Sequence, residues 1–215
     1  MDLVIDRFSD EFTFLEYSFY YKAGLIYHPG RDSEALCMAV MEKLTGREKI
    51  LEIGTGSGCI AITIKKNFPE SYVVAADISQ DSIDCTAQNM AKNRQDLDLL
   101  VISDMLSGIQ KLPFDVMVGC LPFMSSAEYD SMTEEKKEES RPRNAFDAGA
   151  SKYHCFDRIA ICKEWLSVGG KLFLVVPGNM LDEVNRIYTE SGFSITGSDR
   201  VGELQSYIVE YRRDQ

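Results

Sequence analysis

The strongest constraint on the fold is a regular alternation of short apolar runs with longer helical segments from residue 49 onward. Runs rich in Val, Ile and Leu predict strands at residues 49–53, 72–76, 99–102, 115–118 and 171–176. Helical periodicity predicts helices at residues 59–67, 80–93, 156–166 and 180–191. Gly169 and Gly170 are expected to turn the chain into the strand at 171–176, and residues 206–211 alternate like an edge strand.

This order of elements predicts an α/β fold with a mostly parallel, doubly wound sheet. Right-handed crossovers place helices on both faces of such a sheet. A ligand is then expected outside the carboxyl ends of the strands, where the connecting loops meet.

The first 45 residues have a different character, because they are rich in aromatic side chains: Phe8, Phe12, Phe14, Tyr17, Phe19, Tyr20, Tyr21 and Tyr27. A helix is predicted behind them at residues 33–43. We interpret residues 1–45 as a lead-in that forms a hairpin or cap over the ligand end of the sheet, and residues 46–215 as the main domain. The alternative is that the rings only complete the core.

Composition excludes several classes of protein. The chain has 215 residues, 45% of them hydrophobic and 27% charged, which is typical of a globular domain. A net charge of −11 argues against a nucleic-acid partner, because phosphates are bound by clustered Lys and Arg. The mixed charges of residues 133–139 predict a solvated helix face with Glu–Lys pairs.

Neither end of the chain nor its interior shows a membrane signal. No apolar run reaches the roughly 18–20 residues that span a bilayer. The first residues lack the basic flank and apolar stretch of a signal peptide, so we expect a cytoplasmic protein without a membrane partner. The oligomeric state stays open.

Metal chemistry is not expected. The six cysteines have no spacing typical of a zinc site, and the chain has only two histidines. The thiols are interpreted as reduced and mostly buried.

A glycine-rich loop follows the first of the core strands and opens the next helix. Its candidate binding residues are Glu52, Ile53, Gly54, Thr55, Gly56 and Gly58. A dinucleotide loop would carry its third glycine at position 59, where this chain has Cys59. The carboxylate of Glu52 would also repel a pyrophosphate. The loop therefore favours a ligand without phosphate.

S-adenosylmethionine meets this requirement, since it carries a sulfonium and an ammonium and no phosphate. Glu52 is expected to help hold its cationic end. Asp77, followed by Ile78, ends the second strand and is expected to accept the ribose hydroxyls. Asp104 and Met105 end the third strand and are expected at the adenine. The ordered set predicts S-adenosylmethionine as the cofactor.

Four segments together resemble the HemK-like methyltransferases, which include release factor glutamine methyltransferases. They are the loop at 51–61, residues 114–118 before the active-site tetrapeptide, residues 141–149, and, less closely, residues 25–34. The resemblance implies a Rossmann-like class I methyltransferase fold, with a seven-stranded sheet, mostly parallel, and an antiparallel edge strand.

Two departures from that family bear on the reaction. The family tetrapeptide Asn-Pro-Pro-Tyr is replaced by Cys120, Leu121, Pro122 and Phe123, and a thiol cannot reproduce the amide hydrogen bond of the asparagine. The resemblance implies that the Leu121 carbonyl accepts a hydrogen bond from the substrate and that Phe123 stacks on it. The helical domain with which release factor enzymes hold their partner has no counterpart in the 45 residues before the core.

Several roles stay open at this level. His28 is the candidate base, against a plainly packed or exposed histidine. Cys120 is interpreted as an apolar lining residue rather than a reactive thiol. Tyr20, Tyr21 and Tyr27 either line a substrate pocket or pack in the core.

The sequence thus predicts a methyltransferase that acts on a nitrogen of a small planar or amino-bearing molecule. The alternatives are a protein glutamine methyltransferase and a catalytically silent, cofactor-binding partner subunit.

Overall fold

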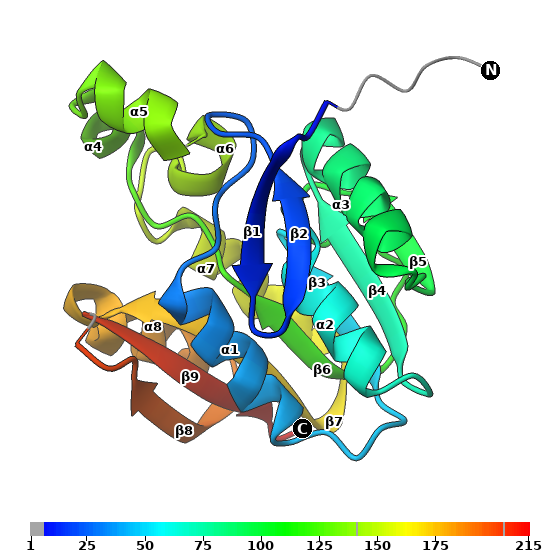
Figure 1. Cartoon of the computed structure of the whole chain (residues 1–215). Coiled ribbons are helices and arrows are strands. Elements are labelled where there is room, and N and C mark those ends of the chain that lie inside the picture. The colour runs from blue at the N-terminus through cyan, green and yellow to red at the C-terminus, as the bar shows by residue number, and fades with distance from the viewer. Residues whose placement is uncertain (1–6, 141, 204) are drawn as a thin grey trace.

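In the described part of the chain, helices cover both faces of one seven-stranded sheet, and a two-stranded hairpin lies apart from it (Figure 1). The computed structural model describes residues 7–140, 142–203 and 205–215. The N-terminal residues used above to exclude a signal peptide lie outside the described residues, as does Arg141 of the family-like stretch. Among the described residues, no helix is both long and apolar enough to traverse a bilayer.

The strand order in the sheet is β5-β4-β3-β6-β7-β9-β8. The strands are β3 (Lys49–Ile53), β4 (Tyr72–Asp77), β5 (Leu99–Ile102), β6 (Phe114–Gly119), β7 (Leu166–Pro177), β8 (Phe193–Arg200) and β9 (Ser206–Arg213). The first five pair in parallel, which confirms the predicted doubly wound sheet. The apolar runs of β3, β4, β6 and the later part of β7 are buried, as in strands covered on both faces, whereas the edge strand β5 leaves Leu99 and Ile102 exposed.

The antiparallel strand near one edge is β9, which pairs antiparallel with both β7 and β8. The outermost strand is β8, which the sequence analysis did not predict. Most of its residues are polar or solvent-facing, and a bulge interrupts its register between Ile195 and Gly197. Such a strand has no continuous apolar run to reveal it.

The helix predicted at 156–166 ends earlier than expected. It consists of α7 (His154–Ala160) and the 3₁₀ helix η1 (Ile161–Glu164), and β7 begins at Leu166. Gly169 and Gly170 therefore lie within β7. The register with β6 is irregular at this point. A Cβ atom on Gly170 would lie 2.8 Å from the Ser167 carbonyl oxygen, so the backbone is too close there for a side chain.

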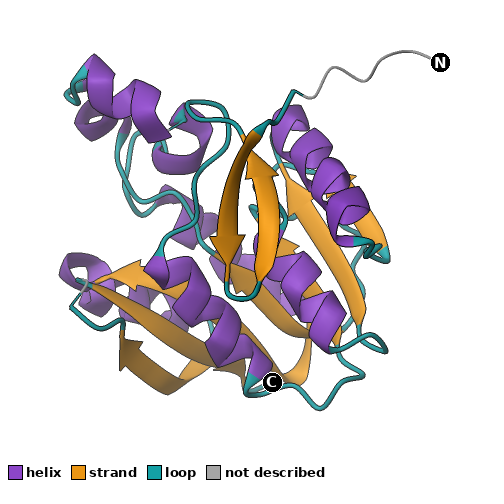
Figure 2. Cartoon of the chain, in the orientation of Figure 1, coloured by secondary structure: helices purple, strands orange, loops and turns teal. Residues whose placement is uncertain are grey.

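The helices divide between the two faces of the sheet (Figure 2). On one face, α1 (Arg31–Met41) and α2 (Cys59–Asn67) pack on side chains such as Ile50 and Val118. On the other face, α7 and α8 (Leu181–Glu190) pack on side chains such as Leu51 and Leu174. Adjacent residues of a strand thus point to opposite faces of the sheet and pack against different helices, as expected for a pleated strand.

The N-terminal hairpin consists of β1 (Asp10–Phe14) and β2 (Tyr17–Tyr21), and it packs against α3 (Gln80–Asn93) outside the main sheet (Figure 1). Phe12, Phe14 and Phe19 are buried in the same apolar cluster as α1 and α2. These rings complete the core.

The connection between β6 and α7 carries three short helices, α4 (Ser126–Asp130), α5 (Glu134–Ser140) and α6 (Arg143–Phe146). The mixed-charge run forms α5, where Lys137 pairs with Glu134 at 2.8 Å. Beyond it, η2 (Gly178–Met180) leads from β7 into α8. All six cysteines are free and five are buried, so the prediction of mostly buried thiols is confirmed.

Candidate functional site

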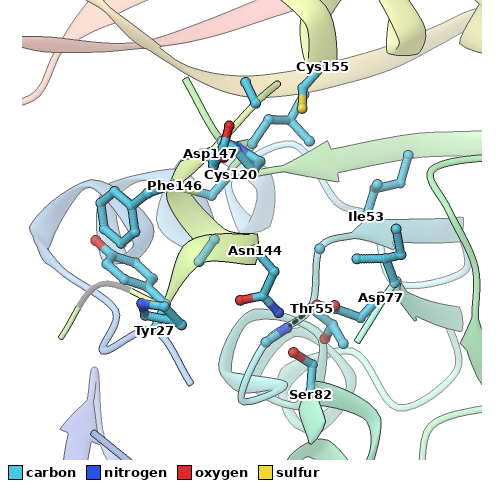
Figure 3. Close-up of a pocket in the computed structure, with 18 of the residues that line it drawn as sticks. Tyr27, Ile53, Thr55, Asp77, Ser82, Cys120, Asn144, Phe146, Asp147 and Cys155 are labelled. Carbon is cyan, nitrogen blue, oxygen red and sulfur yellow. Dashed lines mark hydrogen bonds between the residues drawn. The ribbon is translucent and has the colours of Figure 1, made fainter. Parts of the chain in front are cut away.

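A cavity of about 630 Å³ lies at the carboxyl ends of β3, β4, β5 and β6, within the size range of ligand pockets (Figure 3). The segment at 25–33, the connection at 142–149 and one end of α7 close it from other sides. Figure 3 shows Tyr27 and Phe146 together on one side and Thr55, Asp77 and Ser82 on another. The cavity thus occupies the position expected from strand order.

The glycine loop turns from β3 into α2 and lies against the neighbouring strand. The N–H groups of Gly54 and Thr55 both donate to the Ala76 carbonyl, at 2.8 and 3.0 Å. Gly58, at the start of α2, has a left-handed backbone conformation with φ of 79°. A Cβ atom there would lie 2.7 Å from Thr86 Cγ2. Gly58 does not line the cavity, so its role in the loop is to allow this close approach.

Glu52 is buried at the base of the loop and also lines the cavity. Its Oε2 accepts from the Thr55 hydroxyl at 2.6 Å and from the Ala61 N–H at 3.2 Å. Burial raises the pKa of the Glu52 carboxyl to about 8, against the opposing effect of these two hydrogen bonds. The side chain therefore ties the loop to the first turn of α2.

Asp77 ends β4 with its carboxylate toward the same loop. Its Oδ2 accepts from the Gly56 N–H and its Oδ1 from the Ser79 N–H, both at 2.9 Å. Burial raises the pKa of the Asp77 carboxyl, while these hydrogen bonds lower it. The Ser82 side chain and the Ile78 N–H also lower the pKa by hydrogen bonding, so a ligand hydroxyl would share this carboxylate with donors of the protein. The adjacent Ile78 is exposed and lines the cavity.

Asp104 and Met105 follow β5 and line the far end of the cavity. Asp104 is exposed and accepts from Arg158 Nη1 at 2.7 Å, and this hydrogen bond lowers the pKa of the Asp104 carboxyl. Met105 adopts a positive φ of 53°. Arg158, on α7, also lines the cavity, although no sequence pattern singled it out.

Residues Cys120, Leu121, Pro122 and Phe123 follow β6 and all line the cavity. Cys120 is half-buried, and burial raises the pKa of its thiol to about 12, with a contribution from the nearby Asp32 carboxylate. A neutral thiol is a poor nucleophile, which supports its interpretation as an apolar lining residue.

His28 lies outside the cavity, contrary to the role of base considered above. Its exposed ring lies 5.0 Å from the ring centroids of both Phe12 and Tyr21, and its Nδ1 lies 3.0 Å from the Pro29 carbonyl oxygen. Tyr27 and Pro29 line the cavity, whereas the His28 side chain between them packs against the hairpin. The histidine that lines the cavity is His154.

Of the three tyrosines considered for the pocket, only Tyr27 lines it. Its ring meets Phe146 edge-on, with centroids 5.3 Å apart. Tyr20 packs under Lys92, whose Nζ lies 3.6 Å from the ring centroid. Tyr21 packs against Phe12 in the hairpin.

The family-like stretch contributes residues 142–149 to the cavity wall. Asn144 in this stretch has the only side-chain carboxamide among the described lining residues. The sequence analysis used the stretch for the resemblance and assigned it no role.

The lining residues fit S-adenosylmethionine. The described lining residues include two arginines, and both are paired with aspartates: Arg143 with Asp130 and Asp147, and Arg158 with Asp104. A pyrophosphate would find no uncommitted guanidinium there, whereas the lining carboxyl of Asp77 has no ion-pair partner among the described residues. Ser57 also lines the cavity, but its hydroxyl oxygen is buried within the protein, next to the Cys59 thiol.

The chain resembles known proteins in sequence and in structure. It is 33% identical over 164 residues to a bifunctional methyltransferase of Rickettsia bellii, covering 75% of this chain and 29% of that protein. It is 33% identical over 164 residues to a release factor glutamine methyltransferase of Koribacter versatilis, covering 74% of this chain and 58% of that protein. The chain thus spans less than two thirds of the length of either relative.

Among solved structures, a ribosomal protein methylase from Lactobacillus delbrueckii subsp. bulgaricus superposes with a TM-score of 0.67 at 20% identity. The match covers 88% of this chain and 82% of that one, which confirms the Rossmann-like methyltransferase fold. The model of the methyltransferase small domain family matches residues 19–138, more than half of the chain. The chain therefore belongs to the methyltransferase small domain family, a family of S-adenosylmethionine-dependent methyltransferases.

Proposed function

We propose that this chain transfers a methyl group from S-adenosylmethionine to a nitrogen of a planar or amino-bearing acceptor. The observation that carries the proposal is the convergence of Glu52, Asp77 and Asp104 with the tetrapeptide 120–123 on one cavity. The carboxylates of Asp77 and Asp104 can accept from the hydroxyl and amino groups of a nucleoside, and Glu52 holds the loop beside them. The tetrapeptide lies at the end of the next strand, where an acceptor can approach it.

The cofactor is proposed to lie along the carboxyl ends of β3, β4 and β5. Glu52 and the loop at 52–58 would hold its methionine end. Asp77 would accept the ribose hydroxyls, and Asp104 and Met105 would meet the adenine. When bound, the cofactor supplies an electrophilic methyl group on a sulfonium.

The acceptor is proposed to lie at Cys120, Leu121, Pro122 and Phe123. A backbone carbonyl at Leu121 can accept from an acceptor N–H, and the Phe123 ring can stack on a planar group. A neutral amine attacks the methyl carbon in line through its lone pair, displaces the sulfur as a neutral thioether, and needs to be oriented more than it needs a base. His28 is therefore absent from the proposed machinery.

We place the chain among the HemK-like enzymes, with a divergent tetrapeptide. The relatives named release factor glutamine methyltransferases favour a glutamine side chain as a second candidate acceptor. The small thiol in place of an amide favours an acceptor held by the backbone and by stacking, such as a small planar metabolite.

Residues 1–45 are proposed to act as a cap on the methyltransferase domain at 46–215. The segment after the hairpin supplies Leu25, Tyr27 and Pro29 to the cavity. These side chains face the tetrapeptide end, so the cap would help to exclude water from the acceptor.

Calorimetry with S-adenosylmethionine tests the cofactor site. Replacing Asp77 with Ala should weaken binding by about 1–3 kcal/mol, because hydrogen bonds to a charged group are lost. Asp84→Ala is the matched control, since Asp84 lies on α3 and is an exposed partner of Arg7. An unchanged affinity in Asp77→Ala would refute the assignment of Asp77 to the ribose.

Methyl transfer itself is tested with radiolabelled cofactor against two pools, small heteroaromatic amines and glutamine-containing peptides. Label in the first pool supports the small acceptor, and label in the second supports the protein acceptor. Cofactor binding without transfer to any pool would indicate a silent partner subunit.

A further inference from the structure

Asn89 is a fully buried amide on α3 that takes no part in the cavity wall. Its Nδ2 donates to two backbone carbonyls, those of Tyr20 at 2.9 Å and Ser57 at 2.8 Å. Its Oδ1 accepts from the Tyr20 N–H at 2.6 Å. One side chain thus bridges strand β2 of the hairpin and the glycine loop.

On the loop side, α3 fixes two successive carbonyls. The Thr86 hydroxyl donates to the Gly56 carbonyl at 3.1 Å, one helical turn before Asn89 binds the Ser57 carbonyl. Thr86 also lies against Gly58, which leaves no room for a Cβ. The loop conformation is therefore determined by α3 as well as by its own glycines.

On the hairpin side, the bonds to Tyr20 fix the strand that leads into the cavity wall. The chain turns directly after β2, where the Leu25 and Ile26 N–H groups donate to the Lys22 carbonyl. The next residues include Leu25, Tyr27 and Pro29, which line the cavity. Cys85 adds a sulfur contact to the Tyr20 carbonyl at 3.3 Å.

We infer that Asn89 is a positioning residue that couples the cofactor loop to the N-terminal hairpin, so that cofactor binding orders the cavity wall supplied by residues 25–29. The inference rests on the proposed cofactor site. The coupling follows from the burial of the Asn89 amide, whose hydrogen-bond partners are fixed. If the Ser57 carbonyl shifts, Tyr20 must shift with it, because otherwise a buried polar group loses its hydrogen bond.

A neighbouring residue provides the matched control. Asn93 lies one turn further along α3, and its Nδ2 donates to the Ser18 carbonyl of the hairpin at 3.1 Å and to the Asn89 carbonyl. It joins the hairpin to α3 without contacting the glycine loop. Asn93→Leu therefore removes an attachment of the hairpin but leaves the bridge intact.

The experiment measures amide hydrogen exchange of the intact chain with and without S-adenosylhomocysteine, together with its affinity by calorimetry. In the wild type, the ligand should slow exchange both in residues 54–60 and in residues 18–29. In Asn89→Leu, the affinity should fall about tenfold, and the slowing should be confined to residues 54–60. Asn93→Leu should respond like the wild type.

The inference is overturned if the ligand slows exchange in the hairpin of Asn89→Leu as much as in the wild type, or not at all in the wild type. Failure of the wild type to bind the ligand would instead overturn the proposed function. Asn89→Ala removes the same hydrogen bonds with a smaller side chain. It gives the same test if the leucine variant does not fold.

Discussion

Glu52 is a carboxyl buried within the loop, and its burial makes the stability of the chain depend on pH. Its pKa in the folded chain is about 8, against an ordinary value of 4.5. Between these values the folded chain holds a proton that the unfolded chain releases. The free energy of unfolding should therefore fall as the pH rises through this window.

Glu52→Gln should remove this dependence. Urea unfolding at pH 5, 7 and 9, followed by the fluorescence of the buried Trp165, measures it. Relative to the wild type, the variant should gain stability with rising pH, by up to about 5 kcal/mol at pH 9. A difference that stays constant with pH would show that Glu52 is ionised throughout.

The sequence predicted the positions of side chains at strand ends and failed for those within loops. Asp77, Asp104 and Cys120 follow strands, and the carboxyl ends of parallel strands meet at one edge of the sheet. His28 lies in an irregular segment, where neighbouring side chains point in unrelated directions. Periodicity carries no information there, so the sequence could not show which way the His28 side chain points. In the structure it is His154 that lines the cavity.

At the level of elements, the start of α2 is sensitive to any side chain at Gly58. Both Gly56 and Gly58 have positive φ, of 59° and 79°. A Cβ at Gly56 meets nothing within 4 Å, whereas at Gly58 it lies 2.7 Å from Thr86 Cγ2. Gly56→Ala should cost about 1 kcal/mol from backbone strain alone.

Gly58→Ala should cost about 2–4 kcal/mol, because strain and steric overlap with α3 add together. Urea denaturation of the two variants measures the difference. Equal losses would mean that α3 moves away without cost, and would also weaken the inferred bridge through Asn89.

Element prediction succeeded where burial is high. The strands β3, β4 and β6 have continuous buried runs, and α2 and α3 match the predicted bounds. It failed for β8, where Phe193 is the one buried residue. There, pairing with β9 determines the strand, and this long-range contact leaves no local pattern.

At the scale of the molecule, burial should protect every thiol from alkylation. Burial raises the pKa of all six cysteine thiols, Cys120 included. Because the thiolate is the reactive form, iodoacetamide at pH 8 should label none of them in the folded chain within minutes. In urea all six should react, as counted by mass spectrometry. Rapid labelling of Cys120 in the folded chain would contradict its assignment as an apolar lining residue.

The position of β9 between β7 and β8 has a consequence for the order of assembly. β8 pairs with β9 alone among the described strands, and β9 follows it in the chain. β8 therefore has no partner until β9 has formed, and the two should join β7 together as one hairpin. No described residue beyond Arg158 lines the cavity. The edge hairpin nevertheless completes the core beneath the cavity, because Cys155 of the cavity wall belongs to the same apolar cluster as Phe193 and Tyr211.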